Sequence, residues 1–239
     1  MQWNRNQIHL NFRVIICLLV CAAFIAFYTG IGGASSVACV APQKVSAQTL
    51  VLDAGHGGED GGAVSVTGAA ESGINLRITL KLKQLCGFFG INTVLTREDD
   101  HSMKDSSAKS LAEMKRTDLT NRVKLIEAQE NAVLISIHQN FFFGAKSSGA
   151  QVFYAPTTQS NLLAERCQQL LVEQVDPSNH RQAKKISADI YLMNHVSCPA
   201  ILVECGFLSN REEAEKLQTD PYQTQLATAI LAAYLTYRK

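Results

Sequence analysis

The sequence of 239 residues lacks a marked excess of charge of either sign. Its 22 lysines and arginines are balanced by 21 aspartates and glutamates, which leaves a formal net charge of +1. So small an excess argues against nucleic acid as a partner, because such binding depends on neutralising phosphates. Charged residues make up 18% of the chain and hydrophobic residues 46%, a composition that excludes intrinsic disorder for most of it. The sequence has no internal repeat, and its length predicts one domain of ordinary size.

Several motifs of metal-binding and catalytic proteins are also missing. None of the seven cysteines forms a pair with the C-x-x-C spacing of a metal knuckle. Five cysteines follow residue 31, an odd number that fits a disulfide framework poorly, so we expect most of them in the core. A bridge between Cys198 and Cys205 stays open. The H-E-x-x-H motif of zinc endopeptidases is absent, and the glycine-rich loop 55–62 has neither G-x-G-x-x-G nor Walker spacing.

The beginning of the chain differs in composition from the rest. Residues 1–48 contain three basic residues and no acid, and 14–31 form an uncharged apolar run. A positive flank before such a run is typical of an export signal, and the run is long enough for a retained membrane anchor. We therefore expect the protein to work outside the cytoplasmic membrane. The predicted organisation is a signal peptide or N-terminal membrane anchor at 1–31, a linker at 32–48 and a catalytic domain at 49–239.

After residue 48, short β-rich segments alternate with helical ones. The predicted strands are 49–54, 91–97, 132–138, 150–154, 191–193 and 200–204. The predicted helices are 71–89, 118–130 with Asp118 as its cap, about 160–174, a short one after Asn210 and one from Pro221 to the C-terminus. Residues 98–117 are polar and have no clear period, so we expect an irregular segment on the surface. This alternation predicts a twisted α/β sheet with helices on both faces.

Three predicted strands end in residues that can carry chemistry. His56 follows the first strand, His138 ends the third and Glu204 ends the last, while Glu71 stands near the start of the first helix. Ligands of open α/β sheets bind beyond the carboxyl ends of the strands, so we expect these side chains to converge. Two imidazoles and a carboxylate, here His56, His138 and Glu71, form a typical catalytic zinc site. Glu204 would then be the general base.

Each of these residues also has an ordinary structural explanation. A histidine at a strand end is more often a hydrogen-bonded structural residue, and Glu71 could be an acid that the helix dipole favours. Glu204 is harder to explain, because a carboxylate in an apolar strand needs a partner. Cys205 beside it invites a cysteine-nucleophile interpretation, but its side chain should point to the opposite face of the strand. The residue pattern alone leaves the metallohydrolase and the structural roles open.

Five sequence blocks together resemble a known family. The blocks are LDAGHGGEDGGA (52–63), Glu71 with Asn75, TR (96–97), LISIHQN (134–140) and AILVECGFLSN (200–210). In content and order they are similar to the zinc-dependent N-acetylmuramoyl-L-alanine amidases of the type 3 catalytic domain. The likeness runs from about Leu50 to the C-terminus. Segments 147–154 and 184–210 most resemble the germination-specific spore-cortex amidases within that family.

The resemblance implies a fold, a reaction and a set of roles. The fold is a single α/β domain with a six-stranded, mostly parallel twisted sheet flanked by helices. One zinc ion per chain is held by His56, Glu71 and His138, and Glu204 is catalytic. The reaction is hydrolysis of the amide between N-acetylmuramic acid and L-alanine in peptidoglycan, on a glycan strand with its stem peptide. In spore cortex, this step prepares muramic acid for a deacetylase partner that completes the muramic-δ-lactam needed for germination.

Other residues near these blocks are candidates for contacts with substrate or a partner. Arg97 could bind a stem-peptide carboxylate through its guanidinium or pair with the acids at 98–100. Gln139 and Asn140 are predicted to touch substrate. Phe141–Phe143 could form a sugar-facing wall or a hydrophobic loop that docks an activating protein partner. Two other functions stay open: a vegetative amidase of cell separation or mother-cell lysis, and a catalytically silent peptidoglycan-binding protein.

Overall fold

The computed structural model describes residues 48–142 and 147–237. The strands are β1 (Thr49–Ala54), β2 (Thr93–Leu95), β3 (Ala132–Asn140), β4 (Gln151–Tyr154), β5 (Lys184–Lys185) and β6 (Ala200–Phe207). The helices are α2 (Glu71–Phe88), α3 (Leu111–Glu127), α4 (Ser160–Gln174), α5 (Tyr191–His195), α6 (Arg211–Lys216) and α7 (Asp220–Thr236). The predicted leader at 1–31 and the linker at 32–48, except for Gln48, lie outside the described residues.

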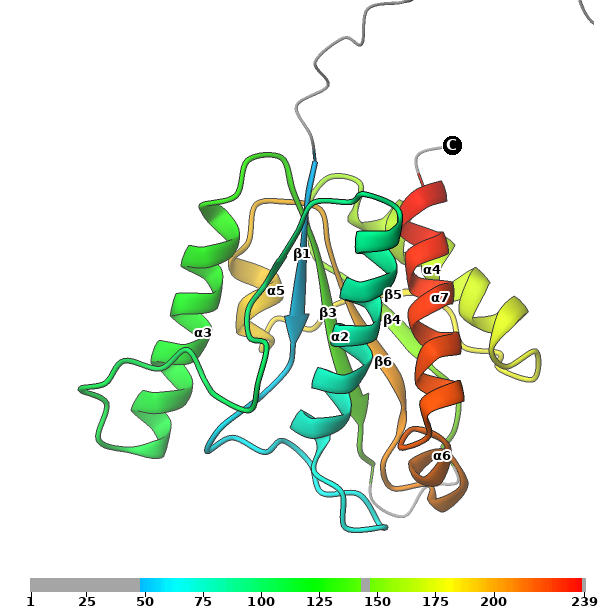
Figure 1. Cartoon of the computed structure of the whole chain (residues 1–239), viewed down its shortest axis with the longest axis horizontal. Helices are drawn as coiled ribbons and strands as arrows, with labels where there is room; N and C mark the ends of the chain where they lie inside the picture. Colours follow the sequence, from blue (N-terminus) through cyan, green and yellow to red (C-terminus); the bar gives the residue numbers. More distant parts are fainter. Residues whose placement is uncertain (1–47, 143–146, 238–239) are drawn as a thin grey trace, which may run out of the picture. The chain divides into compact units, whose positions relative to one another are not determined.

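The strands form one six-stranded sheet in the order β2-β1-β3-β6-β4-β5. β2, β1, β3 and β6 are parallel to one another, whereas β4 pairs antiparallel with β6 and parallel with β5. The predicted α/β fold with a mostly parallel sheet is therefore confirmed. In Figure 1 the arrows of β1 and β3 point toward the bottom of the view, and the chain leaves β1 there for the loop that leads to α2. The carboxyl ends of the central strands meet at this edge of the domain.

Helices cover both faces of the sheet. α2, α4 and α7 pack on one face, called here the α2/α4/α7 face, and α3 and α5 pack on the other, the α3/α5 face (Figure 1). Successive side chains of a strand point to opposite faces, so each central strand feeds both cores. The α2/α4/α7 face receives Leu50, Leu52, Val133, Ile135, Ile137, Ile201, Val203 and Cys205. The α3/α5 face receives Val51, Ala132, Leu134, Ala200 and Leu202. Burial on both faces explains the unbroken apolar runs in the sequence.

Helix α2 follows the sequence prediction closely. Its buried apolar residues Ile74, Ile78, Leu82 and Cys86 recur every four positions and form one stripe against the sheet. The chain then turns at Gly90, whose φ of +66° lies in the left-handed region that glycine enters without a steric penalty. The predicted helix at 71–89 is confirmed to within one residue at its C-terminal end. Its first residue is Glu71, one of the predicted metal ligands.

Helix α3 begins at Leu111, well before the predicted start at Asp118. Ser110 and Glu113 form a capping box: the Ser110 hydroxyl accepts from the Glu113 N–H, and the Glu113 carboxylate accepts from the Ser110 N–H. Asp118 lies inside the helix, where it accepts a 2.9 Å hydrogen bond from Arg122. The predicted cap was wrong because the first turns of α3 are largely exposed, so their apolar residues Leu111, Ala112 and Met114 do not form a buried stripe.

The predicted fifth strand was also wrong. Residues 191–193 belong to the short helix α5, in which the adjacent Leu192 and Met193 are both buried in the α3/α5 core. Two neighbouring buried residues suit a helix turn, whereas a strand would direct them to opposite faces. The sixth strand of the sheet is instead β5, Lys184–Lys185, an exposed two-residue edge strand. A pair of exposed lysines has no apolar alternation by which the sequence could reveal it.

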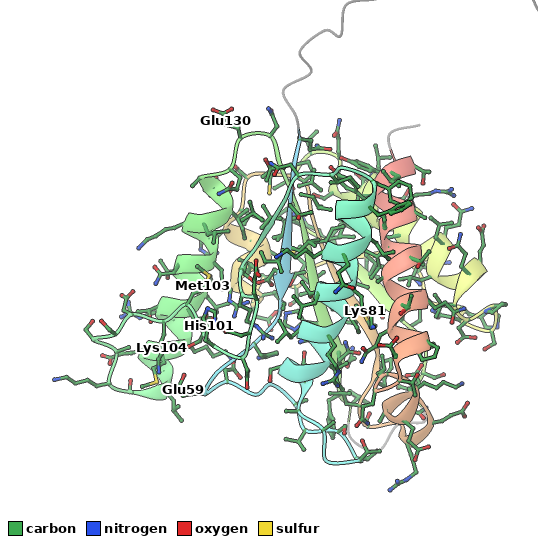
Figure 2. The ribbon with its side chains drawn as sticks, in the orientation of Figure 1. Glu59, Lys81, His101, Met103, Lys104 and Glu130 are labelled. Carbon is green, nitrogen blue, oxygen red and sulfur yellow. The ribbon has the colours of Figure 1, made fainter. Side chains whose placement is uncertain are left out.

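The segment between β2 and α3 ties the loop after β1 to α3. The Met103 N–H donates a 2.6 Å hydrogen bond to Asp118, and the Asn121 side chain donates a 2.8 Å bond to the Met103 carbonyl. The Lys104 ammonium forms an ion pair with Glu59 of the glycine-rich loop. Figure 2 shows Glu59, Met103 and Lys104 together beside α3. The segment between β2 and α3 therefore connects the loop that carries His56 to α3.

The cysteines of the described residues are free thiols. Cys86, Cys167 and Cys205 are buried in the core as expected, and Cys198 is half-buried. The Cys198–Cys205 bridge is therefore absent. Across 48–142 and 147–237, none of the helices combines the length and apolarity needed to span a bilayer. The apolar run predicted to be a signal or anchor lies outside these residues.

Candidate metal centre

Four polar side chains on the α3/α5 face lie at the carboxyl ends of the three central strands. Asp53 comes from β1, Ser136 and His138 from β3, and Glu204 from β6. The strand register pairs Asp53 with Ser136 and His138 with Glu204. All four side chains line one cavity of about 370 Å³. Side chains two residues apart on a strand point to the same face of the sheet. The alternation that points the earlier apolar residues of these strands into the α3/α5 core therefore points these polar residues into the cavity.

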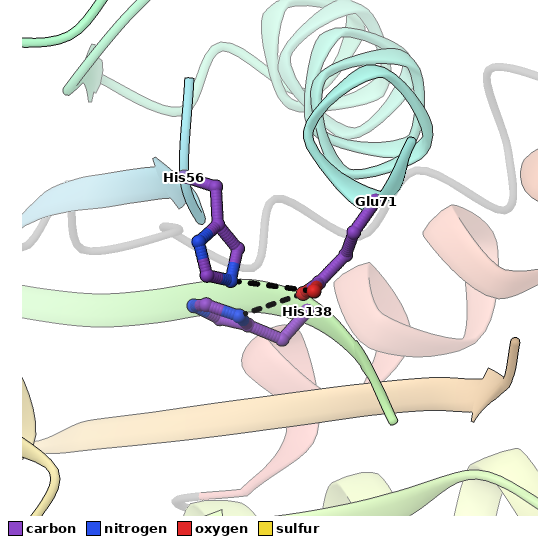
Figure 3. Close-up of side chains that lie close together, drawn as sticks. All are labelled: His56, Glu71 and His138. Carbon is purple, nitrogen blue, oxygen red and sulfur yellow. Dashed lines mark hydrogen bonds and ion pairs between the residues drawn. The ribbon is translucent and has the colours of Figure 1, made fainter. Parts of the chain in front are cut away.

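His56, Glu71 and His138 converge in this cavity. Each offers one ligand atom, and these atoms all lie within 4.8 Å of one another. His56 Nε2 is 3.3 Å from Glu71 Oε2, and His138 Nδ1 is 3.0 Å from Glu71 Oε1. In Figure 3 both imidazoles face the carboxylate, which projects from the start of α2. The structure thus brings together the three residues that the sequence marked as metal ligands.

Two glycines make this close approach possible. A Cβ on Gly55 would lie 2.2 Å from atoms of the His138 ring. A Cβ on Gly62, whose φ is +69°, would lie 2.6 Å from Glu71 Oε2 and 2.8 Å from His56 Cδ2. Two imidazole nitrogens and one carboxylate oxygen are the donors that catalytic zinc sites use. The donor types and the space kept free of Cβ atoms fit a metal ion of this kind.

Glu71 is oriented by its neighbours. Its Oε2 accepts a 3.0 Å hydrogen bond from the Ala63 N–H, and its Oε1 accepts bonds from the Gln139 N–H at 3.1 Å and the Asn75 amide at 3.2 Å. Burial raises the pKa of Glu71, but hydrogen bonds from His138 and His56 outweigh it and hold the pKa well below its usual range. The carboxylate is therefore ionised and fixed in position, as a metal ligand must be.

His56 has a second carboxylate partner that the sequence analysis missed. Its Nδ1 lies 3.0 Å from Asp60 Oδ2, so Nε2 is the nitrogen that faces Glu71. Such a carboxylate fixes the tautomer and ring orientation of a ligating histidine. Burial lowers the pKa of His56, but hydrogen bonds to Asp60 and Glu71 raise it to about 9. The raised pKa favours the protonated imidazole, and a metal ion bound at this nitrogen would replace the proton.

A buried arginine holds the backbone behind the ligands. Arg122 is 1% exposed and donates to Asp53 Oδ1 at 2.6 Å, to Asp118 Oδ2 at 2.9 Å and to the His56 carbonyl at 2.7 Å. Asp53 also accepts hydrogen bonds from Ser136 and Thr96. Burial raises the pKa of Asp53, but Arg122 and these hydroxyls lower it to about 2. Arg122 and His56 are 66 residues apart in the sequence, so no local pattern could show this contact.

Arg97 does not lie where its predicted substrate contact requires. It is 2% exposed, and its guanidinium donates to the backbone carbonyls of Ala54, Gly55, Ser72 and Asp99. These bonds use four of the five N–H donors, so no pair is left for a bidentate bond to a stem-peptide carboxylate. They tie the loop after β1 to the start of α2, so Arg97 supports the segments that carry His56 and Glu71. The sequence analysis offered two roles for Arg97, a substrate contact or an ion pair with the acids at 98–100. Neither role includes these hydrogen bonds to backbone carbonyls.

Glu204 stands beside the ligand group without a partner of its own. Its side chain lines the cavity, and its buried Oε2 accepts no hydrogen bond from the described residues. Burial raises the pKa of Glu204 to about 7, while His138 acts to lower it and Glu71 to raise it further. A carboxyl group that titrates near neutrality can both accept and release a proton. The adjacent Cys205 lies in the opposite core, where burial raises the pKa of its thiol. A nucleophilic role for Cys205 is therefore excluded.

The residues predicted to touch substrate have different environments. Gln139 lines the cavity but is 4% exposed, and its amide donates a 3.1 Å hydrogen bond to Asn75, a partner of Glu71. Asn140 is half-buried, and its carbonyl accepts a 2.7 Å bond from the Leu208 N–H. Their contacts with substrate stay predictions. Of the Phe141–Phe143 segment, Phe142 is 61% exposed, whereas Phe143 lies outside the described residues.

Residues 50–235 match the family model described as N-acetylmuramoyl-L-alanine amidase. The chain belongs to this family. The germination-specific N-acetylmuramoyl-L-alanine amidase of Bacillus subtilis strain 168 is 36% identical over 194 residues, which cover 81% of each chain. The CwlD amidase from Clostridioides difficile, solved in complex with the GerS lipoprotein, is 39% identical with a TM-score of 0.77, covering 80% of this chain and 98% of that chain. AmiC2 of Nostoc punctiforme is 29% identical with a TM-score of 0.67, covering 80% and 97%.

The family assignment confirms the resemblance inferred from the five sequence blocks. The amidase hydrolyses the N-acetylmuramoyl-L-alanine bond of peptidoglycan. Its matched region spans β1 to α7 and therefore includes the cavity with His56, Glu71, His138 and Glu204. The catalytically silent binding protein considered from the sequence does not fit this assignment.

Proposed function

We propose that this amidase is a zinc enzyme in which His56, Glu71 and His138 hold one ion per chain and Glu204 is the catalytic acid–base. The observation that carries the proposal is the convergence of the three ligand atoms within 4.8 Å beside Glu204, whose buried Oε2 accepts no hydrogen bond within 48–142 and 147–237. The donor set and the space at Gly55 and Gly62 support zinc as the ion. When bound, zinc supplies a Lewis acid that polarises a carbonyl group and lowers the pKa of water.

Glu204 performs the proton transfers of the reaction. Its carboxylate removes a proton from the attacking water, whose oxygen forms a bond with the lactyl carbonyl carbon. The protonated Glu204 then delivers that proton to the nitrogen of L-alanine as the carbon–nitrogen bond breaks. The products are a lactyl carboxylic acid on the sugar and a stem peptide with a free amine. Burial raises the pKa of Glu204 above its ordinary value, which favours the protonated carboxyl that delivers the proton to the leaving nitrogen.

The proposal is tested by zinc content and turnover of the purified full chain and of Glu204→Gln. We expect about one zinc per chain in both proteins, and turnover lower by roughly 10²- to 10⁴-fold in the variant. Glu130→Gln is a matched control, because Glu130 is an exposed acid far from the ligand group (Figure 2). Wild-type turnover in Glu204→Gln would reject the role of Glu204. A folded wild-type chain that hydrolyses peptidoglycan without binding zinc would reject the metal.

The proposed biological substrate is spore-cortex peptidoglycan. The germination-specific amidase of Bacillus subtilis, similar to this chain over 81% of both, supports the proposal. Removal of the stem peptide there exposes the lactyl carboxyl for lactam formation, with a muramic acid deacetylase as the partner in the sequence of reactions. Muropeptide composition of spores from a deletion strain tests this. Loss of muramic-δ-lactam with normal vegetative growth is expected, whereas a cell-separation defect with intact lactam would favour the vegetative alternative.

We also propose a protein partner and an extracytoplasmic location. The Clostridioides difficile amidase, at 39% identity, was solved in complex with a lipoprotein, and Phe142 offers an exposed aromatic side chain beside β3. The apolar run at 14–31 would direct export or attach the enzyme to the membrane. Affinity capture from sporulating cells with wild type and Phe142→Ser, and fractionation of membranes, test these two points. An intracellular pool of the full chain would contradict the location.

A further inference from the structure

The cavity continues from the metal ligands into the space between α3 and α5. Leu119 of α3, the segment Ile190–Leu192 and Leu202 of β6 give it an apolar wall. Most of its charged lining is acidic: Asp53, Asp60, Glu71, Asp118, Asp189 and Glu204. An acidic peptide that enters this space therefore needs a cationic group to offset the surrounding carboxylates.

Only two of the described residues that line this cavity are lysine or arginine, and they differ in access. Arg122 is 1% exposed, and Asp53, Asp118 and backbone carbonyls occupy its guanidinium. The side chain of Lys115, on the first half of α3, is 59% exposed. Its ammonium forms an ion pair with Asp60 at 3.6 Å, a distance longer than that of an ordinary hydrogen bond. Lys115 therefore keeps donors available for a ligand.

Lys115 also lies at a suitable distance from the ligand group. Its ammonium and His56 Nδ1 approach the same oxygen of Asp60, at 3.6 Å and 3.0 Å. An extended peptide spans about 3.3–3.6 Å per residue, so Lys115 is within about two residues of the imidazole. Lys115 further lines two smaller hollows, one together with Met114 and one together with Arg116. Lys115 therefore lines all three spaces.

We propose that Lys115 is a specificity-determining residue that binds the free carboxylate of the stem-peptide residue next to L-alanine. The inference rests on the proposed placement of the reaction at His56, Glu71 and His138. The scissile amide lies at that group, the L-alanine side runs toward α3, and the following residue brings its carboxylate to the Lys115 ammonium. Lys115 thus takes the role that the sequence suggested for Arg97, whose guanidinium is buried.

Two matched substrates test the proposal with the zinc-loaded full chain. Both are peptidoglycan fragments of several disaccharide units, with D-glutamate or D-isoglutamine as the second stem residue, so that they differ by one carboxylate against one amide. We expect wild type to prefer the free acid by about fivefold to tenfold in kcat/KM, mainly through KM, as for a partly exposed charge-assisted contact. Lys115→Ala should bring the ratio near one, and Lys115→Glu should reverse it. Lys115→Arg should keep a preference for the acid.

The ratio separates substrate recognition from an indirect effect on the metal site. Loss of zinc or of Glu204 function would lower turnover of both substrates alike and leave the ratio unchanged. Lys124→Ala is the control, because Lys124 is exposed on the same helix but does not line the cavity. An unchanged ratio in Lys115→Ala, or equal use of both substrates by wild type, overturns this inference while the proposed function stands. Full turnover of either substrate by Glu204→Gln overturns the proposed function instead.

Discussion

The two faces of the central strands differ in what they contain at the carboxyl edge. On the α2/α4/α7 face, Ile137, Val203 and Cys205 belong to the apolar core. On the α3/α5 face, the neighbouring positions of the same strands hold His138 and Glu204, and the apolar core stops below them. Because side chains alternate along a strand, a residue of the apolar core and a residue of the candidate site are direct neighbours in β3 and in β6.

This difference shows what holds the residues of the candidate site in place. Glu204 accepts no hydrogen bond at Oε2 from the described residues, yet its strand is fixed by parallel pairing with β3 and by the apolar side chains on the other face. The polar face has its own support, because Arg122, Asp53 and Ser136 form a buried bonded group beneath the ligands. Substitutions on the two faces should therefore have separable effects on stability, metal binding and turnover.

The largest effect on stability is expected for Arg122→Ala. This change leaves Asp53 buried without its cation and removes a donor from the His56 carbonyl. Breaking a buried ion pair by removing one partner costs about 3–5 kcal/mol. Urea unfolding measures the loss, with Arg116→Ala as an exposed control on the same helix, expected to stay within about 0.5 kcal/mol. A loss below about 1 kcal/mol in Arg122→Ala would show that the buried pair does not stabilise this face.

Gly55→Ala should affect metal binding more than folding. The new Cβ would lie 2.2 Å from the His138 ring, so the imidazole has to move from its place beside Glu71. We expect zinc affinity to fall by roughly 100-fold, measured by competition with a chelator. Gly87→Ala is the control, because a Cβ there meets nothing within 4 Å and alanine favours a helix. Equal zinc affinity for both variants would show that Gly55 is dispensable for the site.

Acid should destabilise the polar face through Asp53. Its pKa in the folded protein is about 2, below the ordinary 3.8. A lowered pKa means that the ionised carboxylate stabilises the fold above the ordinary value, and this contribution is lost as the pH falls from about 4 to about 2. The loss should be about 2 kcal/mol. Unfolding at pH 5 and pH 2.5 measures it, and Asp53→Asn should show a correspondingly smaller difference between the two conditions. The same pH dependence in both proteins would assign the effect to other acids.

The smallest effect is expected for Cys205→Ala on the apolar face. Removing the buried sulfur should cost about 1 kcal/mol of stability, close to the value of one buried methylene group. Turnover should stay at the wild-type level, because the thiol lies in the opposite core from the cavity. Parallel unfolding and hydrolysis assays measure both. If Cys205→Ala lost turnover while keeping its stability, the separation between the two faces would be contradicted.

The sequence predicted the elements wherever a regular apolar pattern exists. Helix α2 and the buried central strands follow from such patterns, and their ends carry the residues quoted in the five blocks. The start of α3 and the identity of the fifth strand were wrong, because the exposed first turns of α3 and a pair of edge lysines carry no such pattern. The Ser110–Glu113 capping box is the local signal that marks the start of α3.

At the site, the sequence by itself determined the donor types and their order along the chain: His56, Glu71, His138 and Glu204. It also determined the face of the sheet to which a strand residue points. Because side chains alternate along a strand, Glu204 and its neighbour Cys205 point to opposite faces. Only the tertiary structure decided which charges meet. Asp60 against His56, Arg122 against Asp53 and the burial of Arg97 depend on contacts between distant segments. The local sequence pattern predicts the direction in which a side chain leaves its own strand or helix. The charged group that it meets and the burial that shifts its pKa arise only when distant segments of the chain pack together.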